Sequence, residues 1–169
     1  MVNVELNKQA RLSEHFTLGE LTKTSVNSLD RNIPSHEVIE NLKRLCPWLE
    51  ELRYTYNSLY CLKPGEDYET SKNVEPVIIT SGSRSPDVNR AVGGAYSSNH
   101  LTGCAVDIRC VGVEQAIRYA AILLDAADDR QEDFDELLIE RNRKGRYWVH
   151  FAVRPPKEGN RRKVLFINA

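Results

Sequence analysis

Apolar residues recur with helical spacing in two long segments of the chain. After Ser35, an N-cap residue type, one apolar face repeats every three or four positions, formed by Val38, Ile39, Leu42, Leu45, Leu49 and Leu52. Pro47 interrupts this face and would remove a helical hydrogen bond, so we expect a kink or two successive helices, the second starting near Pro47. A further helix is predicted over 114–127, and Thr17 with Glu20 has the capping-box form that starts a short helix.

The remaining apolar runs are short and rich in β-branched residues, which predicts strands. These runs lie at 76–81, 104–109, 134–140, 147–154 and 162–167. Between them we expect a loop over 61–75, a capped helical turn at 85–89, a flexible loop at 92–95 and a turn at 142–145. Because helices come first and strands follow with one helix among them, the order predicts an α+β fold, with helices packed on one side of a mainly antiparallel sheet.

Composition narrows the class of protein. The chain has 169 residues, 41% hydrophobic and 28% charged, with a net charge of -1. This length and composition predict one globular domain over 1–169. Mean hydropathy is -0.48 and no apolar run has the roughly 18–20 residues of a membrane span. The near-neutral charge argues against a nucleic-acid binder. We therefore expect a monomer with neither a membrane nor a nucleic acid as partner.

The first residues and the cysteines indicate the compartment. Met1–Asn7 shows no basic region followed by an apolar stretch and a cleavage site, so we expect synthesis and residence in a cytoplasm. No two cysteines form a CxxC pair, and we expect four reduced, mostly buried thiols: Cys46, Cys61, Cys104 and Cys110.

Charge is distributed unevenly along the second half of the chain. Residues 114–140 carry nine acidic and two basic side chains, whereas 141–163 carry nine basic and one acidic. Two interpretations remain open. Either these are two solvated faces that attract each other, or the basic segment forms an anion-facing surface beside a site at the end of the hairpin.

Two of the four histidines stand in a pattern that suits a metal. His15 and His36 lie in polar surroundings near helix starts, where surface or capping roles are expected. His100 and Asp107 approach each other only if the chain folds back, and Gly103 between them can take the positive φ that this requires. With His150 on an apolar strand they would leave one coordination position open for water, as in catalytic zinc sites, where zinc lowers the pKa of that water. On spacing alone, a packed core histidine is the commoner explanation.

Several longer motifs appear in a recognisable order. Ser81-Gly-Ser-Arg-Ser-Pro86 is followed by Asn89-Arg-Ala-Val-Gly-Gly94, then by Ser98-Asn-His-Leu-Thr-Gly-Cys-Ala-Val-Asp107, and later by Trp148-Val-His150. Together with 16–21 and 134–140 they resemble the zinc D-Ala-D-Ala carboxypeptidase family (peptidase family M fifteen), which includes bacterial wall peptidases and phage or prophage lysis enzymes. The resemblance runs from about residue 16 to 167.

This resemblance implies a fold, a cofactor and a substrate. It implies an α+β fold shared with hedgehog signalling domains, and zinc held by His100, Asp107 and His150. It implies that Arg84 positions a carboxylate or carbonyl of the substrate, for which a planar guanidinium is suited. The substrate would be a peptidoglycan stem peptide, cut by a carboxypeptidase or endopeptidase of endolysin type. A wall enzyme without an export signal would reach that substrate after phage-type release.

The chain departs from the family at the general base. Many members carry an acidic residue three positions before the last histidine, where this chain has Tyr147. Glu136 and Glu140 on the preceding strand are the candidates to replace it. If 141–145 form the connection, Glu136 faces His150, and both carboxylates lie on the face of that histidine.

Two questions about this hairpin stay open in the sequence. A connection one residue shorter would turn both carboxylates to the other face of the sheet. We favour Glu140, which would face Arg146 in this register, as the base; the alternative is a surface salt bridge from Glu140 to Arg146 or Arg141. We expect a zinc peptidase, against a zinc-containing wall-binding module without hydrolytic activity or a structural domain without metal.

Overall fold

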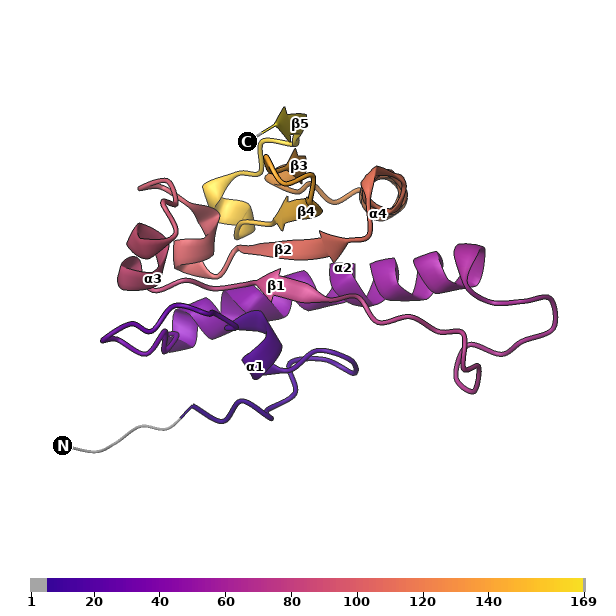
Figure 1. Cartoon of the computed structure of the whole chain (residues 1–169), viewed down its shortest axis with the longest axis horizontal. Coiled ribbons are helices and arrows are strands. Elements are labelled where there is room, and N and C mark those ends of the chain that lie inside the picture. The colour runs from indigo at the N-terminus through magenta and orange to yellow at the C-terminus, as the bar shows by residue number, and fades with distance from the viewer. Residues whose placement is uncertain (1–5, 169) are drawn as a thin grey trace.

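The computed structural model describes residues 6–168, so most of the opening Met1–Asn7 segment lies outside the described residues. Figure 1 shows the arrangement of the helices and strands. In order they are α1 (Leu18–Leu21), α2 (His36–Tyr60), β1 (Ile79–Ser81), α3 (Pro86–Ala91), η1 (Asn99–Thr102), β2 (Ala105–Cys110), α4 (Val113–Arg130), β3 (Glu136–Arg141), β4 (Tyr147–Ala152), η2 (Pro156–Glu158) and β5 (Lys163–Asn168).

Five strands form one sheet in the order β1-β2-β4-β3-β5. The pairs β1–β2, β2–β4 and β3–β4 are antiparallel, and only β5 runs parallel to its neighbour β3. The mainly antiparallel sheet and the α+β class predicted from the order of elements are therefore confirmed.

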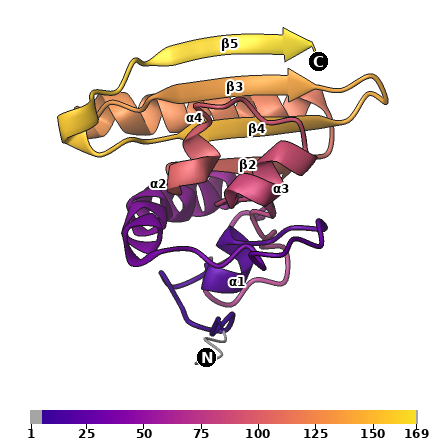
Figure 2. The same ribbon diagram turned by 90° about the vertical axis from the view of Figure 1, so that its left-hand side faces the viewer.

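The two long helices cover one face of this sheet. Alternate strand residues such as Ile108, Val149 and Phe151 point toward α2 and α4 and form one hydrophobic cluster with them. Trp48 of α2 contacts Phe151 of β4, with ring centroids 5.3 Å apart. In Figure 2, α4 lies behind the sheet and α3 lies in front of it. α3 therefore lies on the face opposite to α4, which departs from the one-sided packing that the sequence predicted.

Pro47 neither ends nor divides the first long helix. The structure has one continuous helix from His36 to Tyr60, so the predicted break is wrong. Leu45, Leu49 and Leu52 are fully buried on both sides of the proline, and this burial outweighs the roughly 3 kcal/mol that an interior proline costs. Lys43, whose carbonyl loses its helical partner, is exposed, so water can satisfy that carbonyl.

The first strand is shorter than its apolar run predicts. β1 comprises only three residues, because the chain before it is held by α2. The amide of Asn57 pairs with the backbone of Glu75, donating to its carbonyl at 2.9 Å and accepting from its N–H at 2.6 Å. This side-chain bridge ties Glu75, directly before the predicted strand, to α2. Within the described residues, no helix combines the length and the apolar character that a membrane crossing needs.

Candidate metal centre

Three side chains gather on the front face of the sheet. Asp107 of β2 pairs directly with His150 of β4 in the antiparallel register, and His100 approaches them from η1. One ligand atom from each residue lies within 4.8 Å of the others, and all three residues are buried. The structure thus brings together the three residues that the sequence singled out for a metal.

A left-handed glycine returns His100 over the strand. Gly103 has φ +72° and donates its N–H to the carbonyls of Asn99 and His100, which closes η1. A Cβ atom at Gly103 would lie 2.6 Å from the carbonyl oxygen of Val38. The turn predicted at this glycine is confirmed, and two separate constraints require glycine there.

Neighbouring groups fix the orientation of the first histidine. His100 Nδ1 donates to the carbonyl of Gly82 at 2.6 Å, which leaves Nε2 free and 3.3 Å from Asp107 Oδ1. His150 Nδ1 lies 2.9 Å from the same oxygen. A backbone carbonyl that fixes the ring of a ligand histidine in this way is typical of metal sites. Two imidazoles and one carboxylate oxygen are donors that zinc prefers, so these residues fit the implied metal.

Gly82 itself is held by the first short helix. A Cβ atom on Gly82 would lie 1.9 Å from the carbonyl oxygen of Leu21, and Ser83 donates its N–H to that oxygen at 2.8 Å. The end of α1 therefore packs directly against the backbone that orients His100.

The protonation of the cluster reflects its mutual charges. Burial would raise the pKa of Asp107, but His100 and His150 outweigh it and hold that pKa well below its usual range. Burial would lower the pKa of His150, but hydrogen bonds to Asp107 and Glu136 raise it to about 9. A bound cation would take the place of the proton shared here, because metal ligands must be deprotonated.

Arg84 lies against the cluster from the loop after β1. Its Nη2 donates to Asp107 Oδ2 at 2.7 Å and its Nε donates to Ser81 Oγ at 2.9 Å. The sequence assigned Arg84 to the substrate, and that role stays a prediction. The structure adds that Arg84 occupies one oxygen of Asp107 and turns the other toward the two histidines.

The β3–β4 hairpin is shifted by two residues from the predicted pairing. The connection is 142–146, and Leu138, rather than Glu136, lies opposite His150. Glu136 pairs with Ala152 and Glu140 pairs with Trp148, so the pairing derived from a 141–145 connection is wrong. A shift of two residues preserves the alternation of faces, so both carboxylates still point to the same face as His150.

A side chain in the turn explains the longer connection. Asn142 Oδ1 accepts the backbone N–H groups of Lys144 and Arg146, both at 3.0 Å. The Asn142 N–H also donates to the carbonyl of Arg146. This arrangement closes the loop beyond the last ladder pair, between Arg141 and Tyr147.

The Glu136 carboxylate accepts hydrogen bonds from three neighbouring side chains. It accepts from His150 Nε2 at 3.2 Å, from Asn99 at 3.1 Å and from Arg161 at 3.0 Å, and Lys163 lies 3.6 Å away. The hydrogen bond with His150 is the main cause that lowers the pKa of Glu136 to about 2. A carboxylate with this pKa is a weak proton acceptor.

Glu140 is in a different environment. Within residues 6–168 it forms no ion pair, so the predicted alternative of a salt bridge to Arg141 or Arg146 is absent from this part of the chain. Burial raises the pKa of Glu140, and this outweighs the attraction of His150 and Arg84. Glu140 is thus the candidate whose basicity is increased.

Tyr147 does not face the cluster. Three positions separate it from His150, so in a regular strand it points to the opposite face. There it packs against the hydrophobic cluster, and the guanidinium of Arg141 lies 5.7 Å from its ring centre. An acidic residue at 147 would not reach the candidate metal ligands from this strand.

Sequence reasoning missed the network behind the site. Asp135 is fully buried and accepts hydrogen bonds from Arg161, at 2.8 and 2.7 Å, and from Asn99 at 2.7 Å. Arg154 lies 3.1 Å from the same carboxylate and donates to Asn99 Oδ1 at 2.9 Å. Because Asn99 also donates to Glu136, this network positions the carboxylate next to His150. The only signal in the sequence was the acidic segment followed by the basic one.

The charge pattern is explained in part by these pairs. Arg162 pairs with Asp128 and with Asp133, in addition to the Asp135 network. The interpretation of two oppositely charged segments that attract each other is therefore confirmed for this part of the surface.

Of the other histidines, His15 pairs with Glu50 at 2.6 Å and His36 begins α2. All four cysteines are free thiols in the structure.

The cluster opens into a cavity of about 650 Å³, here called the triad cavity. The residues that line it include His100, Asp107, His150, Glu136, Glu140 and Trp148. Arg84 lies at its wall as well. A molecule bound in the triad cavity would therefore lie beside the candidate metal-binding side chains and beside both carboxylates.

Comparison with known proteins finds a family model that matches the segment around this cavity. A family model described as Peptidase M15 matches residues 66–151, just over half of the chain. The matched range contains every candidate metal ligand, Arg84, Glu136 and Glu140. No curated protein matches the chain.

Proposed function

Because the chain belongs to the Peptidase M15 family, we propose that it is a zinc metallopeptidase that hydrolyses peptide bonds in peptidoglycan stem peptides. The observation that carries this proposal is the convergence of His100, Asp107 and His150 on one side of the triad cavity. A carboxylate with a raised pKa, Glu140, lies in the same cavity. The wall-peptide substrate rests on the motifs from Ser81 to Asp107.

The three ligands would hold zinc through two imidazole nitrogens and one carboxylate oxygen. A zinc ion bound there would supply a Lewis acid that polarises a substrate carbonyl and makes water more acidic. Arg84 keeps Asp107 oriented, and its position at the cavity wall suits a second role in binding a carbonyl or carboxylate of the peptide.

Glu140 would act as the general base. It lines the cavity, it lies on the same face as His150, and within the described residues no cation neutralises it. Its raised pKa brings it closer to neutral pH, where a base transfers protons most efficiently. Glu136, held by Arg161 and His150, would instead position the histidine ring.

The first experiment measures metal content. Protein purified without added zinc, and protein dialysed against zinc, are analysed by inductively coupled plasma mass spectrometry. We expect one zinc per wild-type chain and loss of zinc in His150→Ala, with the fold retained by circular dichroism. His150→Ala protein with full zinc content would contradict the ligand assignment.

The second experiment measures hydrolysis. Purified peptidoglycan is digested with the zinc-loaded protein, and the fragments are identified by mass spectrometry. Glu140→Gln should retain zinc and lower turnover by roughly 100-fold or more, the usual scale for loss of acid–base catalysis, and Glu136→Gln should lower it much less. A wild-type protein that binds zinc and wall fragments but never cleaves them would instead support a wall-binding module.

A further inference from the structure

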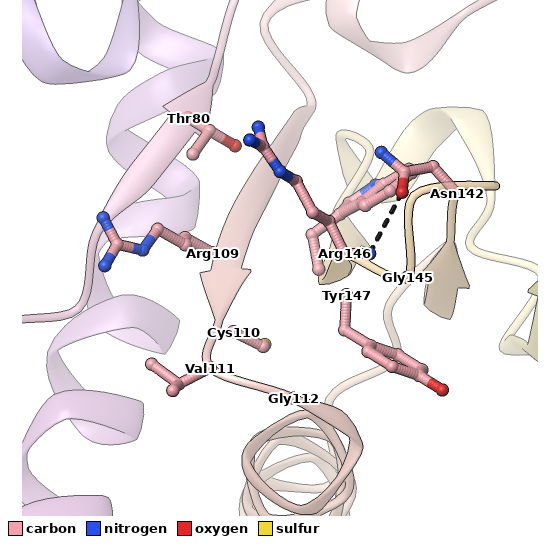
Figure 3. A pocket seen from close by; sticks show the side chains of 10 residues that line it. Thr80, Arg109, Cys110, Val111, Gly112, Asn142, Gly145, Arg146 and Tyr147 are labelled. Carbon is pink, nitrogen blue, oxygen red and sulfur yellow. Dashed lines mark hydrogen bonds between the residues drawn. The ribbon is translucent and has the colours of Figure 1, made fainter.

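A second cavity opens beside the triad cavity, at the end of the sheet. It has a volume of about 680 Å³ and lies at the end of β2, beside the turn that joins β3 and β4. We call it the arginine cavity, because Arg109 and Arg146 are its charged lining residues. In Figure 3 the Arg146 side chain extends from the turn toward Thr80, whereas the Arg109 side chain extends from β2 to the left of the view, away from Arg146.

The two cavities share a wall. Trp148 lines both the triad cavity and the arginine cavity. In the ladder it pairs with Arg109, which lies two residues after Asp107 on the same face of β2. A ligand bound at the triad can therefore continue along the sheet, past the half-buried Trp148 ring, into the arginine cavity.

The charge of the arginine cavity is uncompensated. Its lining contains two arginines and no acidic side chain. Most arginines near the triad are paired with carboxylates: Arg84 with Asp107, Arg161 with Asp135 and Glu136, and Arg162 with Asp128 and Asp133. Among the ion pairs of residues 6–168, neither Arg109 nor Arg146 has a partner.

The backbone beside this cavity is fixed without using either guanidinium. Asn142 accepts the N–H of Arg146, and Gly145 donates its N–H to the Asn142 carbonyl at 2.9 Å. The position of Arg146 is therefore set by the turn, and all its side-chain donors stay available for a ligand.

We propose that the arginine cavity is a subsite that binds a carboxylate of the peptide substrate, with Arg109 and Arg146 as hydrogen-bond donors and the Trp148 ring against the adjoining apolar part of the peptide. The inference rests on the proposed function, since it takes the ligand to be the peptide whose scissile bond lies at the triad. It names the substrate class as anionic peptides. It also gives a role to Arg146 at the end of the hairpin, which forms no ion pair within residues 6–168.

The strand geometry sets where that carboxylate stands in the peptide. Arg109 is two residues from Asp107, and Arg146 is four residues from His150, which corresponds to about 7 and 13 Å along extended strands. A peptide bound in extended form advances by the same distance per residue. The carboxylate should therefore belong to a residue two to four positions from the scissile bond.

The test compares matched peptides by isothermal titration calorimetry. The probes are L-Ala–D-Glu–L-Lys–D-Ala–D-Ala with both carboxylates free, the same peptide amidated at D-Glu, and the same peptide amidated at its C-terminus. Zinc-loaded protein carrying Glu140→Gln keeps the peptides intact during the titration. We expect one of the two amidations to weaken binding by about tenfold or more, the scale of a charge-assisted hydrogen bond.

The arginine variants show where that carboxylate binds. In protein that also carries Arg109→Gln and Arg146→Gln, the free peptide should bind as weakly as the amidated one, because the partner of the carboxylate is gone. Arg143→Gln is the matched control, since Arg143 is an exposed arginine of the same turn that does not line the arginine cavity. It should leave the amidation effect unchanged.

Each outcome decides the proposal. An amidation effect that persists in the double variant, or no amidation effect in the starting protein, overturns the subsite. Cleavage by the wild type without any dependence on these arginines leaves the proposed function standing and removes only the subsite. An arginine-dependent amidation effect in a protein that never cleaves the peptides supports the subsite as a binding site and removes the proposed hydrolysis.

Discussion

Removal of the Asp135 charge is expected to destabilise the protein more than removal of any other single carboxylate near it. Asp135 is fully buried and interacts with Arg161, Arg154 and Asn99. Asp135→Asn preserves the shape of the side chain but places an N–H₂ group where the carboxylate accepted hydrogen bonds. At least one guanidinium then loses its buried partner.

The contacts set the magnitude. Breaking one partner of a fully buried ion pair costs about 3–5 kcal/mol. The side chains of Arg161 and Arg154 are 49% and 25% exposed, so water recovers part of their solvation. We therefore expect a loss of about 2–3 kcal/mol in the free energy of unfolding. For a chain of this length the loss corresponds to a Tm lower by about 5–10 °C.

Thermal and urea denaturation followed by circular dichroism measure this loss. The matched control is Asp133→Asn, because Asp133 is 63% exposed and its ion pair with Arg162, at 3.3 Å, lies on the surface. Its Tm should stay within about 2 °C of the wild type, as for most surface ion pairs. A Tm of Asp135→Asn equally close to the wild type would refute the reasoning that the network stabilises the fold.

The pH dependence of the same variant provides an independent check. Burial would raise the pKa of Asp135, but hydrogen bonds from Arg161 and Asn99 outweigh burial and hold that pKa below its usual value of 3.8. A carboxyl with a lower pKa in the folded state stabilises the fold fully above its unfolded pKa, and this stabilisation is lost as pH falls through the folded pKa. The stability difference between wild type and Asp135→Asn should therefore be constant near neutral pH and shrink below about pH 4.

Three further substitutions follow from the packing. Gly103→Ala should cost about 1–2 kcal/mol or more and weaken zinc binding by calorimetry, because Gly103 has φ +72° and no room for a Cβ beside Val38. Arg84→Lys should retain zinc but lower hydrolysis by about tenfold or more, since lysine lacks the two-pronged contact; unchanged kinetics would contradict it. Leu49→Ala, at a fully buried position, should cost about 2–5 kcal/mol in urea titrations, whereas Leu29→Ala, at a 98% exposed position, should cost under about 0.5 kcal/mol.

The helices and strands were largely predictable because local patterns determine them, whereas the candidate metal ligands were indicated mainly by the resemblance of the motifs to a family. The apolar face of α2, the capping box at Thr17 and the β-branched runs each act over a few residues. The return of His100 toward Asp107 could be predicted for the same reason, since a glycine at 103 lies within the short span that must fold back.

The remaining details depend on contacts between distant residues. Pro47 continues the helix only because the leucines around it are buried by elements far along the chain. The hairpin register depends on the Asn142 side chain, which accepts two N–H groups in the turn, and no strand propensity encodes that choice. The Asp135 network joins η1 to connecting segments far apart in the sequence, so no local motif could indicate it.

The contact of Gly82 with Leu21 ties the segment that identifies the family to a helix that precedes it in the chain. The family match begins at residue 66, after α1 and α2 have ended. Yet the Leu21 carbonyl binds the backbone beside Gly82, whose own carbonyl holds His100. A fragment cut at the start of the match would keep every candidate ligand and lose this support, so recombination or domain grafting would have to carry α1 and α2 with the motif-bearing segment.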